Sequence, residues 1–215
     1  MRAESKEERD LMRGSKYIQS NMGRCFSDVK KDLSKGSTVL FTGTACQIAG
    51  LKGFLGKDYE DLFCVDIVCH GVPSPEVWQK YLNWICKGRT VTVINFRNKQ
   101  KYGWADHVVT VHFDNGEEFD DRAFVKLFGK CYIERPSCFK CPYKSINRES
   151  DITIADYWGI DNADPEMNDN KGVSLVLVNN EKGEKYFDSI KNRIIYKATR
   201  LEDSTQPESK TYRRR

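Results

Sequence analysis

The clearest indication of the fold is the stretch Thr38-Val-Leu-Phe-Thr-Gly-Thr-Ala-Cys-Gln-Ile-Ala-Gly-Leu-Lys-Gly-Phe-Leu55. Residues 38–42 are all apolar or β-branched, which is typical of a short buried strand. A glycine at position 43 follows, and from Gln47 onward apolar residues recur at helical spacing. The stretch therefore predicts a strand that passes through a tight turn directly into a helix.

The same order returns further along the chain. Residues 62–68 predict a second buried strand, after which Ser74 and Pro75 suit the N-cap and first position of a helix. Strand, helix, strand and helix in succession are typical of a parallel α/β unit, whose functional loops lie at the carboxyl ends of the strands. In this chain those two ends carry Cys46 and Cys69.

The pattern then changes to that of an antiparallel section, with short strands expected at residues 91–96, 108–113 and 117–119. Two further strands are expected at 151–157 and 173–178, and a helix at 181–190. Asp114-Asn-Gly116 predicts a hairpin turn. The fold class is therefore α/β: a mixed sheet with strand–helix units in the first half, and an antiparallel β section plus a cysteine loop in the second.

Composition divides the chain into three parts. Residues 1–12 are charged and poor in apolar residues, so we expect a loose leader, or else a helix with nothing to pack on. Residues 13–200 are expected to form a single domain, which opens with a helical pattern from Gly14 to Leu33. Apolar residues become scarce from Leu201, so residues 201–215 are expected to be a disordered tail.

Charge and hydropathy exclude several classes of protein. The chain has 215 residues, of which 39% are hydrophobic and 31% charged, as in soluble globular proteins. Its net charge of +4 is too small and too evenly spread to indicate a nucleic-acid partner. Apolar runs fall short of the roughly 18 residues of a membrane helix, and the start lacks the apolar core of a signal peptide. The sequence predicts a cytoplasmic protein without a membrane span.

The cysteines are the strongest chemical signal. Cys138 and Cys141 form a Cys-x-x-Cys pair, and with Cys46 and Cys69 they offer four thiolates. A [4Fe–4S] cluster and a four-cysteine zinc site both use four thiolates, although the single close pair favours a cluster over a zinc ribbon. A thioredoxin-like redox pair is a further alternative, against which stands the lack of a following strand–helix unit. Cys131 is a competing ligand.

Three other segments carry candidate chemistry, each beside a structural alternative. The turn at Gly43 would present helix N–H groups to a phosphate or a flavin edge, or would only connect strand and helix. Ser15, Lys16 and Ser20 suit a cofactor phosphate or a solvated helix end. The basic, aromatic loop at 96–104 suits an anionic substrate or a solvated turn.

Two further assignments concern single side chains. His70 adjoins Cys69, so it is a candidate to tune a cluster or to move a proton. Asp151 and Asp156 are either an acid–base pair or, the favoured interpretation, a cap and a loop ligand near the cysteines.

Five motifs occur in a fixed order. They are Gly14-Ser-Lys-Tyr-Ile-Gln-Ser20, Phe41-Thr-Gly-Thr-Ala-Cys-Gln-Ile-Ala-Gly-Leu-Lys52, Cys69-His-Gly-Val-Pro-Ser-Pro75, Arg135-Pro-Ser-Cys-Phe-Lys-Cys141 and Ser150-Asp-Ile-Thr-Ile-Ala-Asp-Tyr-Trp-Gly159. Together they resemble the coenzyme F420 hydrogenase/dehydrogenase beta-subunit family over roughly residues 12–180.

The resemblance implies an iron–sulfur flavoprotein oxidoreductase, which passes electrons between a [4Fe–4S] cluster, FAD and a hydride acceptor such as coenzyme F420. It implies that the cluster is held by Cys46, Cys69, Cys138 and Cys141. It implies flavin contacts from Ser15, Lys16, Ser20, Thr42, Gly43, Thr44 and Gln47, with Lys144 near both cofactors. It also implies an electron-transfer partner, such as a ferredoxin-like module encoded just upstream.

The chain departs from the family pattern in three respects, one of which is that we expect the family's usual carboxyl-terminal extension to be cut short. Gly-Thr-Ala-Cys46 replaces the usual Gly-Thr-Pro-Cys, which loosens the turn but keeps the thiol. The motif at Gly14 stands close to the first residue, whereas many members carry a ferredoxin module and more of the flavin domain ahead of it. We therefore expect a partial domain. The alternatives are a zinc-binding structural or interaction module and a non-functional fragment of the oxidoreductase.

Overall fold

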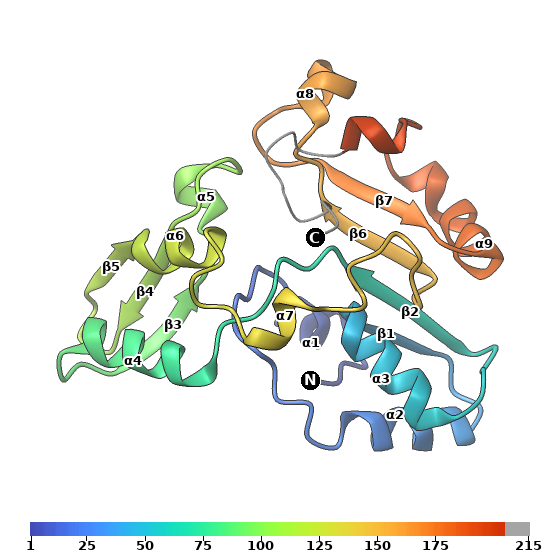
Figure 1. Ribbon diagram of the computed structural model, residues 1–215, viewed down its shortest axis with the longest axis horizontal. Coiled ribbons are helices and arrows are strands. Elements are labelled where there is room, and N and C mark those ends of the chain that lie inside the picture. Colours follow the sequence, from blue (N-terminus) through green and yellow to red (C-terminus); the bar gives the residue numbers. More distant parts are fainter. Residues whose placement is uncertain (205–215) are drawn as a thin grey trace. The chain divides into compact units, whose positions relative to one another are not determined.

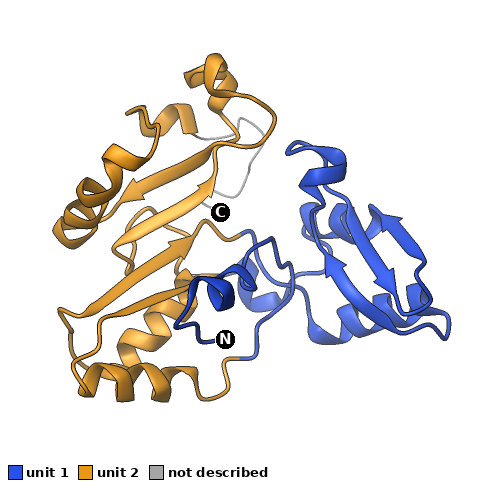
Figure 2. Ribbon diagram, turned by 180° about the vertical axis from the view of Figure 1, so that it is seen from behind, with its two compact units in different colours: residues 1–21, 70–140 blue, residues 22–69, 141–215 orange. Residues whose placement is uncertain are grey.

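The computed structural model describes residues 1–204, which divide into two compact units (Figures 1 and 2). Unit 1 consists of Met1–Asn21 and His70–Lys140, and unit 2 consists of Met22–Cys69 and the chain from Cys141 onward. Both units are therefore discontinuous in sequence. This division does not coincide with the predicted boundaries at residues 12 and 200, which stay predictions.

Unit 2 is built on a four-stranded sheet with the order β1-β2-β6-β7. Strands β1 (Val39–Thr44), β2 (Leu62–Ile67) and β6 (Ile152–Asp156) are parallel, and β7 (Ser174–Val178) pairs antiparallel with β6. The predicted parallel strand–helix–strand unit and the mixed sheet are both confirmed.

Helix α3 (Ala45–Leu55) connects β1 to β2 in unit 2. Ile48, Leu51 and Leu55 recur at helical spacing and are buried, so one face of α3 packs on the sheet. The helix ends where Gly56 adopts φ +70°, a left-handed C-terminal cap that glycine adopts readily. Helix α2 (Cys25–Ser34) adds Val29 and Leu33 to the same core.

The remaining elements of unit 2 follow β6 along the chain. They are α8 (Ile160–Ala163), η1 (Pro165–Met167), α9 (Glu181–Ile190), η2 (Lys191–Arg193) and η3 (Leu201–Ser204). Asn180 caps α9, since its side chain accepts from the backbone N–H of Gly183 at 2.9 Å. Residues 201–204 form η3 although we expected disorder from Leu201; the rest of the predicted tail, 205–215, lies outside the described residues.

Unit 1 contains a three-stranded antiparallel sheet with the order β3-β4-β5. The strands are β3 (Val91–Asn95), β4 (Val109–Phe113) and β5 (Glu118–Asp121). The predicted hairpin turn is confirmed: Gly116 has φ +82°, and its N–H donates to the carbonyl of Phe113 at 3.1 Å. The predicted antiparallel section is therefore confirmed, and it forms a sheet of its own.

The helices of unit 1 are α1 (Lys6–Asp10), α4 (Pro75–Cys86), α5 (Lys99–Tyr102), α6 (Ala123–Gly129) and α7 (Pro136–Phe139). Ser74 caps α4 and Pro75 is its first residue, as predicted. Ile85 of α4 and Phe124 of α6 are buried in one core with Val109 and Val111 of β4. Within residues 1–204, no helix has both the length and the apolar character that a membrane span requires.

The predicted helix from Gly14 to Leu33 is wrong in its first half. Only α2, from Cys25, is helical, and residues 14–24 form turns and irregular chain. Gly14 and Gly23 both adopt positive φ, at +95° and +45°, which interrupts helical geometry. Tyr17 instead stacks on Phe128 of unit 1, with ring centroids 5.1 Å apart, so tertiary packing overrides the periodic pattern.

Candidate functional site

Cys46 and Cys69 lie at the same edge of the unit 2 sheet. Strands β1 and β2 are parallel neighbours, and their last paired residues are Thr44 and Ile67. Cys46 lies two residues after Thr44, and Cys69 lies two residues after Ile67. Neighbouring strands are about 4.8 Å apart, so the chain segments that carry these two cysteines leave the sheet at the same edge.

The turn that leads to Cys46 is held by a side-chain amide. Gln47 accepts the backbone N–H of Thr44 at 2.9 Å and donates to the sulfur of Met22 at 3.1 Å. A Cβ added at Gly43 would lie 2.9 Å from Gln47 Oε1, so the glycine makes room for this contact. The Thr44 hydroxyl lies 3.1 Å from the Cys46 sulfur, and Cys46 itself is exposed. The turn is thus shaped by Gln47, with the thiol facing solvent.

Cys138 and Cys141 belong to a separate turn. Cys138 lies in the short helix α7, which Pro136 opens, and its N–H donates to the carbonyl of Arg135 at 2.9 Å. Cys138 is the last cysteine of unit 1, and Cys141 opens the second stretch of unit 2. Both are half-buried, and within the described residues none of the eight cysteines forms a disulfide bond.

The predicted flavin residues fall into two groups. Thr42, Gly43, Thr44 and Gln47 lie at the carboxyl end of β1 in unit 2, and Lys144 is exposed shortly after Cys141. Ser15, Lys16 and Ser20 lie in the irregular segment of unit 1.

Lys16 is engaged by its own backbone. Its amine donates to the carbonyls of Met12, Arg13 and Gly14 at 2.8, 3.1 and 3.2 Å. Three such bonds occupy the whole donor capacity of an ammonium group. In this conformation Lys16 holds the shape of the segment instead of presenting its charge to a ligand.

The interpretation of Asp151 and Asp156 as an acid–base pair is wrong. They stand at opposite ends of β6, which separates them by roughly 17 Å along an extended strand. Asp151 is buried, accepting the N–H of Cys64 at 2.7 Å and the side-chain amide of Asn180 at 3.0 Å. It is therefore a structural acceptor that joins β2 to the start of α9.

The basic loop at 96–104 is also not an open anion site. Arg97 is buried and donates to the backbone carbonyl of Trp104. Lys101 pairs with Asp120 at 2.6 Å and Glu118 at 2.5 Å, and these hydrogen bonds raise its pKa above the usual value. Both of these cations are therefore bound within unit 1, Arg97 by a backbone carbonyl and Lys101 by two acidic side chains of β5.

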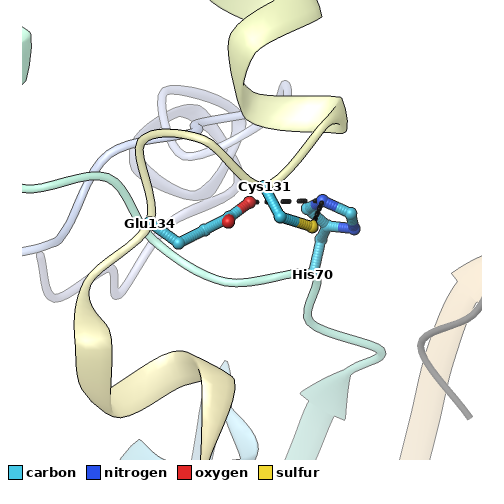
Figure 3. Close-up of side chains that lie close together, drawn as sticks. All are labelled: His70, Cys131 and Glu134. Carbon is cyan, nitrogen blue, oxygen red and sulfur yellow. Dashed lines mark hydrogen bonds and ion pairs between the residues drawn. The ribbon is translucent and has the colours of Figure 1, made fainter. Parts of the chain in front are cut away.

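Sequence reasoning missed one convergence in unit 1. His70, Cys131 and Glu134 lie together, with the ligand atoms of all three within 4.8 Å of one another (Figure 3). Their positions in the sequence link His70 only with its neighbour Cys69, and make Cys131 only a competing cluster ligand. No spacing rule connects His70 to Glu134, because a backbone bridge between Pro73 and Glu134 brings their segments together only in the folded unit.

Two comparisons with known proteins match most of the chain. Residues 36–204 match the family described as the C terminus of the coenzyme F420 hydrogenase/dehydrogenase beta subunit. Among solved structures, the fold is similar to a chain of the xenon-derivatised F420-reducing [NiFe] hydrogenase complex from Methanosarcina barkeri, with a TM-score of 0.55 and 18% identity. No curated protein sequence matches.

The two matches differ in how much of each protein they cover. The structural match covers 89% of this chain and 60% of the hydrogenase chain, so this chain spans about three fifths of that relative. At 18% identity the likeness concerns the fold. The family match, by contrast, covers well over half of the residues. The chain therefore belongs to the coenzyme F420 hydrogenase/dehydrogenase beta-subunit family, in its C-terminal region.

Proposed function

We propose that this chain is the cofactor-holding part of a cytoplasmic iron–sulfur flavoprotein oxidoreductase. The observation that carries the proposal is the placement of Cys46 and Cys69. Each lies two residues after the last paired residue of its strand, and the two parallel strands end at the same edge of the sheet. In open α/β sheets, ligands bind outside the carboxyl ends of the strands. Membership in the beta-subunit family supports the same reaction class.

The donor set suits a [4Fe–4S] cluster. Such clusters use four cysteine thiolates, and Cys46, Cys69, Cys138 and Cys141 form no disulfide among the described residues and are all at least partly accessible. Cys64 differs from them: it is fully buried, and burial raises its pKa to about 11. An ion has no access to a fully buried thiol, so we leave Cys64 out of the proposed quartet.

The residues at the edge also suit part of a flavin site. Thr42 and Thr44 offer hydroxyl groups beside the N-terminus of α3, where backbone N–H groups and the helix dipole favour a phosphate. Gln47 and Lys16 are engaged in shaping their segments, so we assign them a positioning role. We assign direct contacts to Ser15, Ser20, Thr42 and Thr44, with Lys144 adding positive charge.

When bound, FAD exchanges a hydride while an iron–sulfur cluster exchanges single electrons, which couples two-electron to one-electron chemistry. In this proposal the chain supplies the thiolates that hold the cluster and the side chains that orient the flavin. We propose coenzyme F420 as the hydride acceptor, and an electron-transfer protein such as a ferredoxin-like module as the partner.

Iron and sulfide analysis after anaerobic purification and reconstitution tests the cluster. We expect about four iron atoms per chain and a broad absorbance near roughly 400 nm, the pattern of thiolate-bound iron. Cys46→Ser and Cys138→Ser should each lose most of the iron, whereas the matched controls Cys25→Ser and Cys86→Ser should keep it. A colourless product, or one zinc per chain in place of iron, would contradict the proposal.

FAD binding, followed by flavin fluorescence, tests the edge of the sheet. Thr42→Val should weaken binding about two- to tenfold, the worth of one hydrogen bond. Thr38 lies one residue before the amino end of the same strand, so Thr38→Val is the matched control and should leave binding unchanged. Equal effects of both changes would place the flavin elsewhere.

A further inference from the structure

His70, Cys131 and Glu134 offer three different donor atoms at one place in unit 1 (Figure 3). We propose that they form a second metal site, which takes zinc or a similar divalent transition metal and is separate from the four thiolates. The proposal does not depend on the proposed redox function, because none of these three residues belongs to the quartet.

The distances suit a small ion. His70 Nε2 lies 3.3 Å from Cys131 Sγ and 3.3 Å from Glu134 Oε1. Around a tetrahedral zinc ion, with bonds of about 2.0–2.3 Å, neighbouring donor atoms are about 3.3–3.6 Å apart. The three side chains therefore need little movement to surround one ion.

Glu134 supplies the second, independent observation. Its side chain is 3% exposed and pairs with the His70 imidazole at 3.3 Å. Among the described residues, however, neither carboxylate oxygen accepts a hydrogen bond. Burial raises the pKa of this carboxyl group, and the nearby His70 opposes that effect. A buried carboxylate whose oxygens accept no hydrogen bond is costly, and such a group often marks the place of an ion. A divalent cation would compensate its charge directly.

The backbone around the cluster is arranged to hold it. Cys131 has φ +59°, which is uncommon for a residue other than glycine and is found at functional sites. Gly71 has φ +142°, and a Cβ there would lie 2.6 Å from Glu134 Cγ, so glycine makes the space that Glu134 fills. The N–H of Arg135 donates to the carbonyl of Val72 at 2.9 Å, which ties the two segments together.

The donor types indicate the class of metal. One imidazole nitrogen, one thiolate and one carboxylate suit zinc, whereas magnesium and calcium prefer oxygen alone. Three protein ligands leave a fourth position for water or a ligand. His70 is 33% exposed, which gives an ion access. Its Nε2 also lies 3.1 Å from the carbonyl of Phe128, and metal binding would replace that contact.

The test is metal analysis of the full chain after its iron–sulfur sites have been reconstituted and excess zinc has been dialysed away. We expect about one zinc per chain in addition to the iron. Cys131→Ser and Glu134→Gln should each lose the zinc and keep the iron, and the control Cys86→Ser should keep both. Zinc that is equal in all four proteins, or absent from all, would overturn the site. Loss of iron alone would bear only on the proposed function.

Thermal unfolding of the same proteins gives a readout that does not depend on retained metal. In the metal-free chain, Glu134→Gln should raise the melting temperature, because it removes a buried charge. Added zinc should raise the melting temperature of the unsubstituted chain and not that of Glu134→Gln. If zinc raises both equally, Glu134 is not a ligand and the proposal fails.

Discussion

The carboxylate of Asp66 and the guanidinium of Arg148 lie 3.5 Å apart, and their side chains are only 0% and 4% exposed. Asp66 comes from β2, shortly before Cys69, and Arg148 comes from the segment that follows Cys141. The same guanidinium donates to the carbonyl of Tyr143 at 3.2 Å. This buried ion pair therefore ties the chain after one proposed ligand to the strand that leads to another.

Arg148→Met should destabilise unit 2 strongly. The change leaves the Asp66 carboxylate buried without its cation, and breaking a buried pair in this way costs about 3–5 kcal/mol. Urea unfolding followed by circular dichroism measures the loss as a lower midpoint at an unchanged slope.

Two controls separate this effect from general damage at the site. The double variant Asp66→Asn/Arg148→Met should recover much of the lost stability, because the unpaired charge is gone. Lys191→Met removes the exposed partner of Asp188 and should change stability little. An Arg148→Met protein as stable as its parent would show that the pair contributes nothing.

The stability of unit 2 should fall as pH rises from about 9 to about 11. Burial raises the pKa of Cys64 from 9.0 to about 11, so the folded state holds this proton more tightly than the unfolded state. The stabilisation is complete below pH 9 and is lost as pH rises through the folded pKa, by roughly 2–3 kcal/mol in total.

The contribution of Cys64 can be isolated by comparison with Cys64→Ala. Other groups ionise in the same range, but they are shared by both proteins, so the difference in the slope of stability against pH reports Cys64. Equal slopes between pH 8 and 10.5 would refute the assignment. As a second readout, iodoacetamide should modify Cys46 in the folded chain and reach Cys64 only after unfolding, because Cys46 is exposed and Cys64 is not.

Gly183→Ala should destabilise the protein, against the intrinsic preference of a helix. Helix propensity alone predicts a gain of about 1 kcal/mol at this position in α9. A Cβ at Gly183, however, would lie 2.1 Å from the backbone carbonyl of Asp151, and such overpacking costs about 1–3 kcal/mol. Gly53→Ala in α3 is the matched control: it meets no atom within 4 Å and should stabilise by about 0.5–1 kcal/mol. Thermal melts that moved in the same direction would contradict the packing argument.

Tyr81→Phe should weaken unit 1 by about 1.5–3 kcal/mol, the range for a hydrogen bond to a charged group. The Tyr81 hydroxyl donates to Asp121 at 2.9 Å, and the same carboxylate oxygen accepts the N–H of Phe124 at 3.2 Å. Burial and this hydrogen bond raise the pKa of Tyr81 well above its usual range, so the hydroxyl stays a donor in alkaline buffer. Tyr132→Phe, at a side chain that is 71% exposed, should leave unfolding by urea unchanged. Matching losses in the two variants would rule out a specific role for Tyr81.

Most of the secondary structure was predictable because its causes are local. The β-branched run of β1, the Ser74-Pro75 cap of α4 and the Asp-Asn-Gly hairpin act within a few residues, and each is confirmed. The failed helix at residues 14–24 shows the limit of this reasoning. Its periodic residues serve another purpose, since Tyr17 packs on Phe128, which lies far away in sequence.

The candidate site was only partly predictable. Two strand ends at a parallel edge could be expected to bring Cys46 and Cys69 together, because parallel pairing follows from the strand–helix–strand pattern. The roles of Asp151 and of the loop at 96–104 could not, because each depends on partners from distant segments.

Local sequence patterns are enough to predict the α/β character of the chain, its family and the positions of its cysteines at strand and helix ends. The folded structure was needed to show that two discontinuous units form, that a glycine of α9 meets the carbonyl of Asp151, and that His70 meets Cys131 and Glu134. The two kinds of feature differ in the distance along the chain over which their causes act. Propensity, capping and periodicity act over a few residues, whereas burial and side-chain convergence depend on contacts between segments far apart in the chain.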